Sequence, residues 1–186
     1  MRSLISACLL VLLSSCAGAP VDSTQNDNYF NTHAKLMQSL PGTAVTSEPL
    51  DRFQNVLGDF NVGMTEENLR SLYADELYFN DTFVTITTID ALVEYLLKTA
   101  NNATTTVKML DVSKSETDYY LRWSMDIEFV ARGKAIRSRS IGMTQVRFNE
   151  QGKVIFHQDY WDSANAFYQH LPVVGGLVQR VRNSLH

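Results

Sequence analysis

The spacing of apolar residues predicts helices in the first half of the chain and strands in the second. Residues 48–60 carry the clearest helical pattern, because their apolar side chains recur every three or four positions and share one face. These side chains are Leu50, Phe53, Val56, Leu57 and Phe60. A second helix is expected from Thr65, which can cap its start, to about Ala74. A third is expected over residues 89–100, with Thr88 as its cap.

Alternation of apolar and polar residues replaces this spacing after residue 103. Residues 119–130 put Tyr119, Leu121, Trp123, Met125, Ile127 and Phe129 on one face and polar side chains on the other. This pattern is typical of a half-buried antiparallel strand. The other expected strands are residues 77–81, 104–112, 135–148 and 153–161. Three helices followed by long strands predict an α+β domain with helices on one face of a curved antiparallel sheet.

The end of the chain is expected to be helical over residues 163–171 and 177–185, with breaks at Pro172 and Gly175–Gly176. Asp162 can cap the first of these helices. Leu177, Val178, Val181 and Leu185 would share one face of the second helix. We expect this face to pack against the domain, and contact with a membrane is the alternative.

The first fifteen residues read as a signal peptide. Arg2 gives a positive start, and residues 4–13 form an apolar run that is too short to span a bilayer. The segment Leu13-Ser14-Ser15-Cys16 resembles the bacterial lipobox, which implies cleavage before Cys16 and acylation of that residue. The alternative is an ordinary secretory signal with an incidental cysteine.

Residues 16–46 then form a lipidated tether, rich in small and polar residues, with a short amphipathic piece around residues 29–40. Residues 47–186 form one domain with a C-terminal helical extension. Cys8 leaves with the signal peptide, so a mature domain with a lipidated Cys16 has no free thiol for a disulfide or a metal site. Ala17 follows the cysteine, which under the Gram-negative sorting pattern points to the outer membrane, facing the periplasm.

The charge balance argues against nucleic acid as a partner. Removal of Arg2 leaves fifteen basic and twenty acidic residues, whereas a nucleic-acid-binding domain needs a basic face. The histidines show no metal-ligand spacing, and no cofactor motif is present, so neither a metal nor a cofactor is expected.

Two segments carry a family resemblance: YADELYFND at residues 73–81 and VRFNEQGKVIFHQDYWD at residues 146–162. They resemble the nuclear transport factor 2-like superfamily, and within it the SnoaL-like polyketide cyclases and the ketosteroid isomerases. The resemblance covers about residues 50–165. It implies a cone-shaped sheet wrapped over helices, with a pocket between them, and it implies no single function because this fold serves enzymes, binding modules and dimerisation domains.

The resemblance to the isomerases places Asp81 at the position of their general base and Trp161 in the pocket wall. The two enolate-stabilising donors of the isomerases have no counterpart. Phe53 and Val56 occupy the stretch of the first-helix tyrosine, and Thr144 stands where the isomerases have a protonated aspartate. Loss of one such donor costs about 2.7–4 kcal/mol of transition-state stabilisation, so steroid isomerisation is not expected.

Strand alternation extends the expected pocket. If Trp161 faces it, Asp159 and His157 face it too, because residues two and four positions away share one side of a strand. Thr144 joins them from the neighbouring strand, and Trp123 or Tyr119 would supply apolar walls. A carboxylate beside an imidazole is a typical arrangement for proton transfer, which makes Asp81, His157 and Asp159 the candidate catalytic residues.

Plainer interpretations stay open for each of these residues. His157 and Asp159 could simply satisfy each other's hydrogen bonds at a cavity wall, and Asp81 could cap a turn.

The sequence leaves three functions open. The first is a membrane-tethered module that binds a small hydrophobic or amphipathic molecule. The second is a cyclase- or isomerase-like enzyme that uses Asp81 or the His157–Asp159 pair. The third is a non-catalytic envelope scaffold, with a homodimer through the sheet face.

Lipid anchoring should depend on Cys16. The variant Cys16→Ser, expressed in a Gram-negative host, should accumulate as unprocessed precursor without an acyl label, because the thiol that receives the lipid is missing. Metabolic labelling with palmitate checks this. Normal labelling of the variant would contradict the lipobox interpretation.

Overall fold

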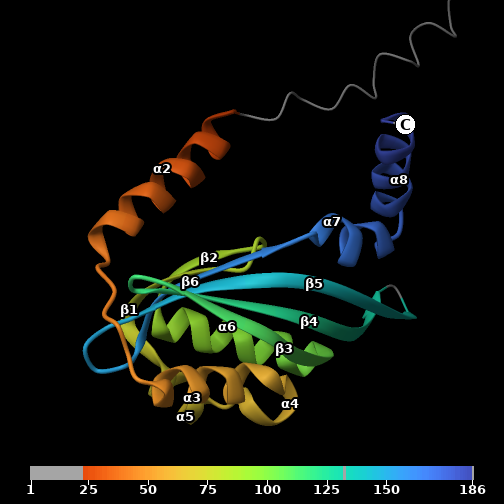
Figure 1. Ribbon diagram of the computed structural model, residues 1–186. Helices are drawn as coiled ribbons and strands as arrows, with labels where there is room; N and C mark the ends of the chain where they lie inside the picture. Colours follow the sequence, from red (N-terminus) through yellow and green to blue (C-terminus); the bar gives the residue numbers. More distant parts are fainter. Residues whose placement is uncertain (1–22, 132, 186) are drawn as a thin grey trace, which may run out of the picture. The chain divides into compact units, whose positions relative to one another are not determined.

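The computed structural model describes residues 23–131 and 133–185, in two compact units that divide after Ser39. The first unit contains helix α2 (Ser23–Ser39), which is longer than the amphipathic piece expected in the tether. The expected signal peptide and Cys16 lie outside the described residues. The second unit starts at Leu40 and holds all other elements that the described residues form (Figure 1).

Within the described residues of the second unit, four helices precede or interrupt the sheet: α3 (Ser47–Gly58), α4 (Phe60–Gly63), α5 (Glu66–Leu72) and α6 (Ile89–Asn102). The expected single helix over residues 48–60 is divided at Asp59, whose carboxylate accepts the backbone N–H groups of Asn61 and Val62 and so starts α4 as a separate helix. Thr65 caps α5 as expected. Thr88 occupies the capping position of α6 but makes no capping hydrogen bond.

The sheet has six strands: β1 (Tyr73–Asn80), β2 (Thr85–Thr88), β3 (Ala103–Ser115), β4 (Asp118–Ala131), β5 (Lys134–Phe148) and β6 (Val154–Trp161). Their order is β2-β1-β6-β5-β4-β3, and every neighbouring pair is antiparallel except β1 and β6. Figure 1 shows the curved sheet with α3, α4 and α6 on one side of it. The expected α+β architecture is confirmed.

The strand β1 corrects one expected boundary. It begins at Tyr73, directly after α5 ends at Leu72, so the helix expected to reach Ala74 is shorter and the strand expected from residue 77 is longer. Tyr73 and Leu72 are both fully buried. The change from helix to strand therefore occurs inside the core, where packing rather than local propensity decides it.

The core lies between the helices and the inner face of the sheet. Its fully buried side chains come from α3, α5, α6 and four strands. They include Phe53, Leu69, Leu92, Leu121, Val146 and Phe148. The apolar faces predicted for residues 48–60 and 119–130 contribute Phe53 and Leu121, so both periodic patterns locate the core.

Residues 40–46 belong to the domain, although the sequence places them in the tether. The Thr43 N–H donates to the Phe148 carbonyl oxygen at 2.8 Å, and the Val45 N–H donates to the Tyr119 hydroxyl at 2.9 Å. The Leu40 carbonyl accepts from Arg147, which also forms an ion pair with Asp118. These hydrogen bonds from backbone and side-chain groups join the segment to β4 and β5.

The C-terminal extension contains α7 (Ser163–Ala166), the 3₁₀ helix η2 (Tyr168–His170) and α8 (Val174–Ser184). Asp162 caps α7 as expected. The expected break at Gly175–Gly176 is wrong, because both glycines lie in the first turn of α8. A Cβ on Gly175 would lie 2.1 Å from the Gln169 carbonyl oxygen, so glycine permits the close approach of α8 to η2.

The apolar face of α8 is mostly exposed. Leu177, Val181 and Leu185 are 56%, 61% and 77% exposed, and only Val178 of the expected face is half-buried, so the expected packing of this face on the domain is wrong for three of its four residues. Within the described part of the chain, no helix has both the length and the hydropathy needed to cross a membrane.

The buried ion pair between Arg147 and Asp118 should stabilise the domain. Asp118→Asn should lower the free energy of unfolding by about 3 kcal/mol, the low end of the cost of removing one partner from a buried pair. Asp111→Asn is the matched control, because Asp111 pairs with Arg122 across two strands at the surface and such pairs contribute less than about 1 kcal/mol. Chemical denaturation measures both, and equal losses would contradict the prediction.

The effect of Asp118→Asn should also depend on pH. Burial opposes ionisation of Asp118, but the hydrogen bonds from Arg147 and Gln145 outweigh it and lower the pKa of the carboxyl group. A carboxyl with a lowered pKa in the folded state stabilises the protein above its unfolded pKa and loses this contribution as the pH falls through the folded pKa. The difference between wild type and variant should therefore be full at pH 6 and shrink below about pH 4.

Candidate functional site

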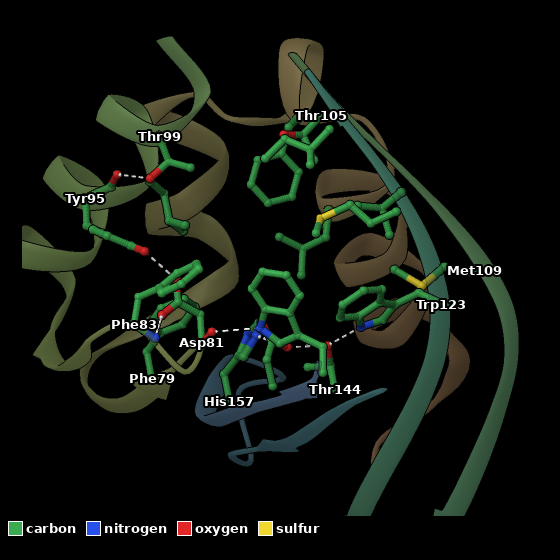
Figure 2. Close-up of a pocket in the computed structure, with 18 residues that line it drawn as sticks. Phe79, Asp81, Phe83, Tyr95, Thr99, Thr105, Met109, Trp123, Thr144 and His157 are labelled. Carbon is green, nitrogen blue, oxygen red and sulfur yellow. Dashed lines mark hydrogen bonds and ion pairs between the residues drawn. The ribbon is translucent and has the colours of Figure 1, made fainter. Parts of the chain in front are cut away.

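A cavity of about 130 Å³ lies between the helices and the inner face of the sheet. Its walls are mainly apolar and come from α3, α4, α6 and the strands β3 and β4. Wall residues include Leu57, Phe60, Val107, Met109, Met125 and Ile127. Figure 2 shows Asp81, His157 and Thr144 close together at one end of the cavity, with Thr105 at the other.

Strand β6 supplies the polar end of the cavity, because its side chains alternate between the cavity face and the opposite face of the sheet. His157, Asp159 and Trp161 all line it. Gln158 faces the opposite side, where its side chain bonds to Tyr78 and Asn80. The pairing of β6 with β5 is regular from Phe156 to Trp161, so no bulge disturbs the expected parity.

A chain of hydrogen bonds holds the buried His157 ring in place. The Tyr73 hydroxyl lies 2.9 Å from Nδ1, and Asp159 Oδ1 lies 3.0 Å from Nε2. Burial, with a smaller contribution from Asp159, raises the pKa of Tyr73 well above its ordinary value, so its hydroxyl keeps its proton and can donate a hydrogen bond to Nδ1. A neutral ring with its proton on Nε2 satisfies both bonds.

The chain continues through Asp159 to the neighbouring strands. The Thr144 hydroxyl donates to Asp159 Oδ1 at 2.5 Å, and the Trp123 indole N–H donates to the Thr144 oxygen at 2.8 Å. His157 and Thr144 therefore donate to the same oxygen of Asp159. The second oxygen, Oδ2, accepts no hydrogen bond from the residues that the structure describes, and the side chain is 19% exposed.

Asp81 lies directly after β1 and combines the two roles considered for it. Its Oδ1 accepts the backbone N–H groups of Phe83 at 2.9 Å and Val84 at 3.1 Å, which caps the turn. Its Oδ2 accepts the Tyr95 hydroxyl, and the side chain also lines the cavity. Burial is the main cause that raises the pKa of Asp81, and the negative charge of Asp159 adds to it.

Trp161 closes one side of the polar end. Its indole N–H donates to the Asp81 carbonyl oxygen at 2.9 Å, which ties the end of β6 to the end of β1. Phe83 packs edge-on against Trp161, with ring centroids 5.4 Å apart, and its other side meets Phe167 at 5.0 Å. The C-terminal extension therefore contacts the aromatic wall of the cavity.

Trp123 forms another wall and depends on a glycine. Gly142 pairs with Trp123 across β4 and β5, and a Cβ on Gly142 would lie 2.3 Å from the indole ring. The absence of a side chain at residue 142 thus lets the indole lie flat on the sheet. Tyr119, the other expected wall residue, does not line the cavity, because its hydroxyl exchanges hydrogen bonds with the Val45 backbone.

The sequence did not reveal two polar residues of this site. Tyr95 lies in the helix expected over residues 89–100, where nothing assigns it to the pocket, and Tyr73 lies near the end of the helix expected to reach Ala74. Tyr95 could have been found as the hydroxyl-bearing member of the α6 face that also carries Leu92, Leu96 and Thr99. No sequence signal links Tyr73 to His157, which lies 84 positions later.

No group of three potential metal ligands occurs in the described part of the chain. The candidate site therefore consists of two aspartates, one histidine and their hydroxyl and indole partners, set into an apolar cavity. Such a site can accept hydrogen bonds, hold a positive charge or exchange a proton.

Comparisons with known proteins support the fold. No family model matches the sequence, and no curated protein matches it. Among solved structures, an NTF2-like protein of unknown function from Exiguobacterium sp. 255-15 is 21% identical, with a TM-score of 0.50, over 61% of this chain and 98% of its own. A candidate SnoaL-like polyketide cyclase from Shewanella denitrificans OS-217 is 12% identical, with a TM-score of 0.52, over 60% and 91%.

A third structure, from Catenulispora acidiphila DSM 44928, has a ketosteroid isomerase-like fold and was solved in complex with trimethylamine. It is 14% identical, with a TM-score of 0.54, over 69% of this chain and 96% of its own. The likeness to these three structures, at 12–21% sequence identity, establishes that the fold of this chain is nuclear transport factor 2-like.

The Asp81 carboxylate should reduce stability at neutral pH. Its pKa is raised in the folded state, so the wild-type protein loses stability as the pH rises through that pKa, and Asp81→Asn does not. The variant keeps an oxygen that accepts from Phe83 and Val84. It should melt at a higher temperature than wild type at pH 7 and lose this advantage near pH 3.5.

Thermal unfolding followed by circular dichroism measures the difference, and 1 kcal/mol corresponds to about 2–4 °C for a chain of this length. Asp75→Asn is the control, because Asp75 is exposed on β1, the strand that directly precedes Asp81. A variant that is less stable than wild type at pH 7 would show that Asp81 serves the fold rather than the site.

Proposed function

We propose that this protein is an envelope lipoprotein that binds a small hydrophobic or amphipathic molecule in its cavity. The cavity carries the proposal: it has apolar walls and one polar end built from Asp81, His157 and Asp159. Binding sites for small molecules typically combine an apolar lining with a few placed polar groups. The lipobox-like segment supports the anchor at Cys16, and Ala17 supports an outer-membrane location facing the periplasm.

The size of the cavity limits the ligand. An engineered protein cavity of about 150 Å³ binds benzene, so a cavity of about 130 Å³ suits a molecule or a group of similar size. The protein from Catenulispora acidiphila that shares this fold was solved with trimethylamine, which is also small. A larger ligand would have to extend out of the cavity.

A proton-transfer enzyme of the cyclase or isomerase kind is the second candidate. It is favoured by the raised pKa of Asp81, which burial causes, and by the rigid His157–Asp159 pair. The weakness of this candidate is that few hydrogen-bond donors of the site are free to stabilise a developing oxyanion. The Tyr95, Thr144, Trp123 and Trp161 donors are all engaged within the protein. Binding without chemistry therefore fits the geometry better.

Native mass spectrometry of the purified protein tests the binding function. We expect a small molecule to remain bound after gentle purification. Val107→Trp should abolish the additional mass, because Val107 lines the cavity and an indole would fill it. Val112→Trp is the matched control on the same strand, since Val112 is 38% exposed and lies outside the cavity. Retention of the ligand by Val107→Trp would place binding elsewhere.

A further inference from the structure

The cavity carries negative charge without a positive partner. The described residues that line it include Asp81 and Asp159 but no lysine or arginine. His157 is satisfied as a neutral ring, with Tyr73 donating to Nδ1 and Nε2 donating to Asp159. Even if Asp81 holds a proton, the Asp159 carboxylate leaves the site acidic. A partly buried carboxylate without a compensating charge lowers stability, and a bound cation would reduce that cost.

The cavity also offers an acceptor and few free donors. The Asp159 oxygen Oδ2 receives no hydrogen bond from the described residues, while Oδ1 receives two. The indole N–H groups of Trp123 and Trp161 are used within the protein. A ligand that brings its own N–H donor therefore complements this end of the cavity, whereas a carboxylate or phosphate would meet two aspartates.

The walls suit a cation that carries apolar groups. Five aromatic side chains besides Tyr95 and His157 line the cavity. They are Phe60, Phe79, Phe83, Trp123 and Trp161. Aromatic faces attract cations within about 6 Å of the ring centroid, most strongly where water is excluded. The same rings also bury alkyl substituents favourably.

From these three features we infer that the ligand is a small protonated amine with apolar substituents, whose N–H donates to Asp159 Oδ2. This inference rests on the proposed binding function and names the chemical class of its ligand. A charge-assisted hydrogen bond to a partly buried carboxylate is stronger than a neutral one, so it gives the cavity a preference for the charged amine over a hydrocarbon of the same shape.

A pair of isosteric probes tests the inference on the full chain. N-methylpiperidine is protonated at pH 7, and methylcyclohexane has the same ring and methyl group without the charge. Both tryptophans of the sequence, Trp123 and Trp161, line the cavity, so their fluorescence reports binding directly. N-methylpiperidine should bind at least tenfold more tightly than methylcyclohexane.

Two variants test whether Asp159 causes the preference for the amine over the hydrocarbon. Asp159→Asn should weaken N-methylpiperidine binding at least tenfold and so remove its preference over methylcyclohexane, because the amide keeps the shape of the carboxylate and loses its charge. Asp75→Asn removes an exposed carboxylate from β1 and should change neither. Circular dichroism confirms that each variant is folded. If Asp159→Asn does not fold, the comparison of the two probes on the wild-type protein still decides the inference.

The outcomes separate the two proposals. Binding of methylcyclohexane as tightly as N-methylpiperidine would overturn the amine inference and leave a neutral binding site. An amine preference that survives in Asp159→Asn would overturn the role of Asp159 Oδ2. If neither probe changes the fluorescence, and no co-purifying molecule is found, both the inference and the proposed binding function fail.

Discussion

The position of β6 between β1 and β5 is the constraint on which the site depends. Both edges of β6 are paired, so its side chains alternate strictly between the cavity and the opposite face. His157 and Asp159 therefore face the cavity together, while Gln158 bonds on the other side. A shift of one residue in this register would exchange the two sets and remove every ionisable group that β6 gives to the cavity.

Burial of these polar groups requires partners, and the fold supplies them from distant parts of the chain. Tyr73 at the start of β1 serves one nitrogen of His157, and Thr144 on β5 shares Asp159 with the other. Each bond removes the cost of an unsatisfied group in an apolar environment. The same bonds occupy most of the hydrogen-bond donors of the site. What remains facing the cavity is an acceptor oxygen, which is why we propose ligand binding rather than stabilisation of an oxyanion.

The domain contains two kinds of buried aspartate. In the part of the chain that the structure describes, Asp118 has a cationic partner, and Asp81 at the polar end of the cavity does not. Arg147 neutralises Asp118 and lowers its pKa against the effect of burial, so that pair serves the fold. Asp81 has no cationic partner among the described residues, and burial raises its pKa. A buried ionisable group that lowers the stability of the fold is typical of a functional site, where the group serves ligand binding or a reaction.

The sequence by itself determined the fold class, the core faces of α3 and β4, and the cavity-facing set His157, Asp159 and Trp161. The fold class and the core faces follow from periodicity, which is local: a period of two or 3.6 residues assigns faces without knowledge of neighbours. Periodicity also puts His157, Asp159 and Trp161 on one face of β6, and the resemblance to the isomerases implied that this face lines the pocket. Only the tertiary structure decided the partners of those residues. Tyr73 and Tyr95 reach the site because β1 pairs with β6 and α6 packs against β1, whereas the hydroxyl of Tyr119 bonds to the Val45 backbone instead. Such contacts join residues far apart in the chain, and no local pattern encodes the distance between them.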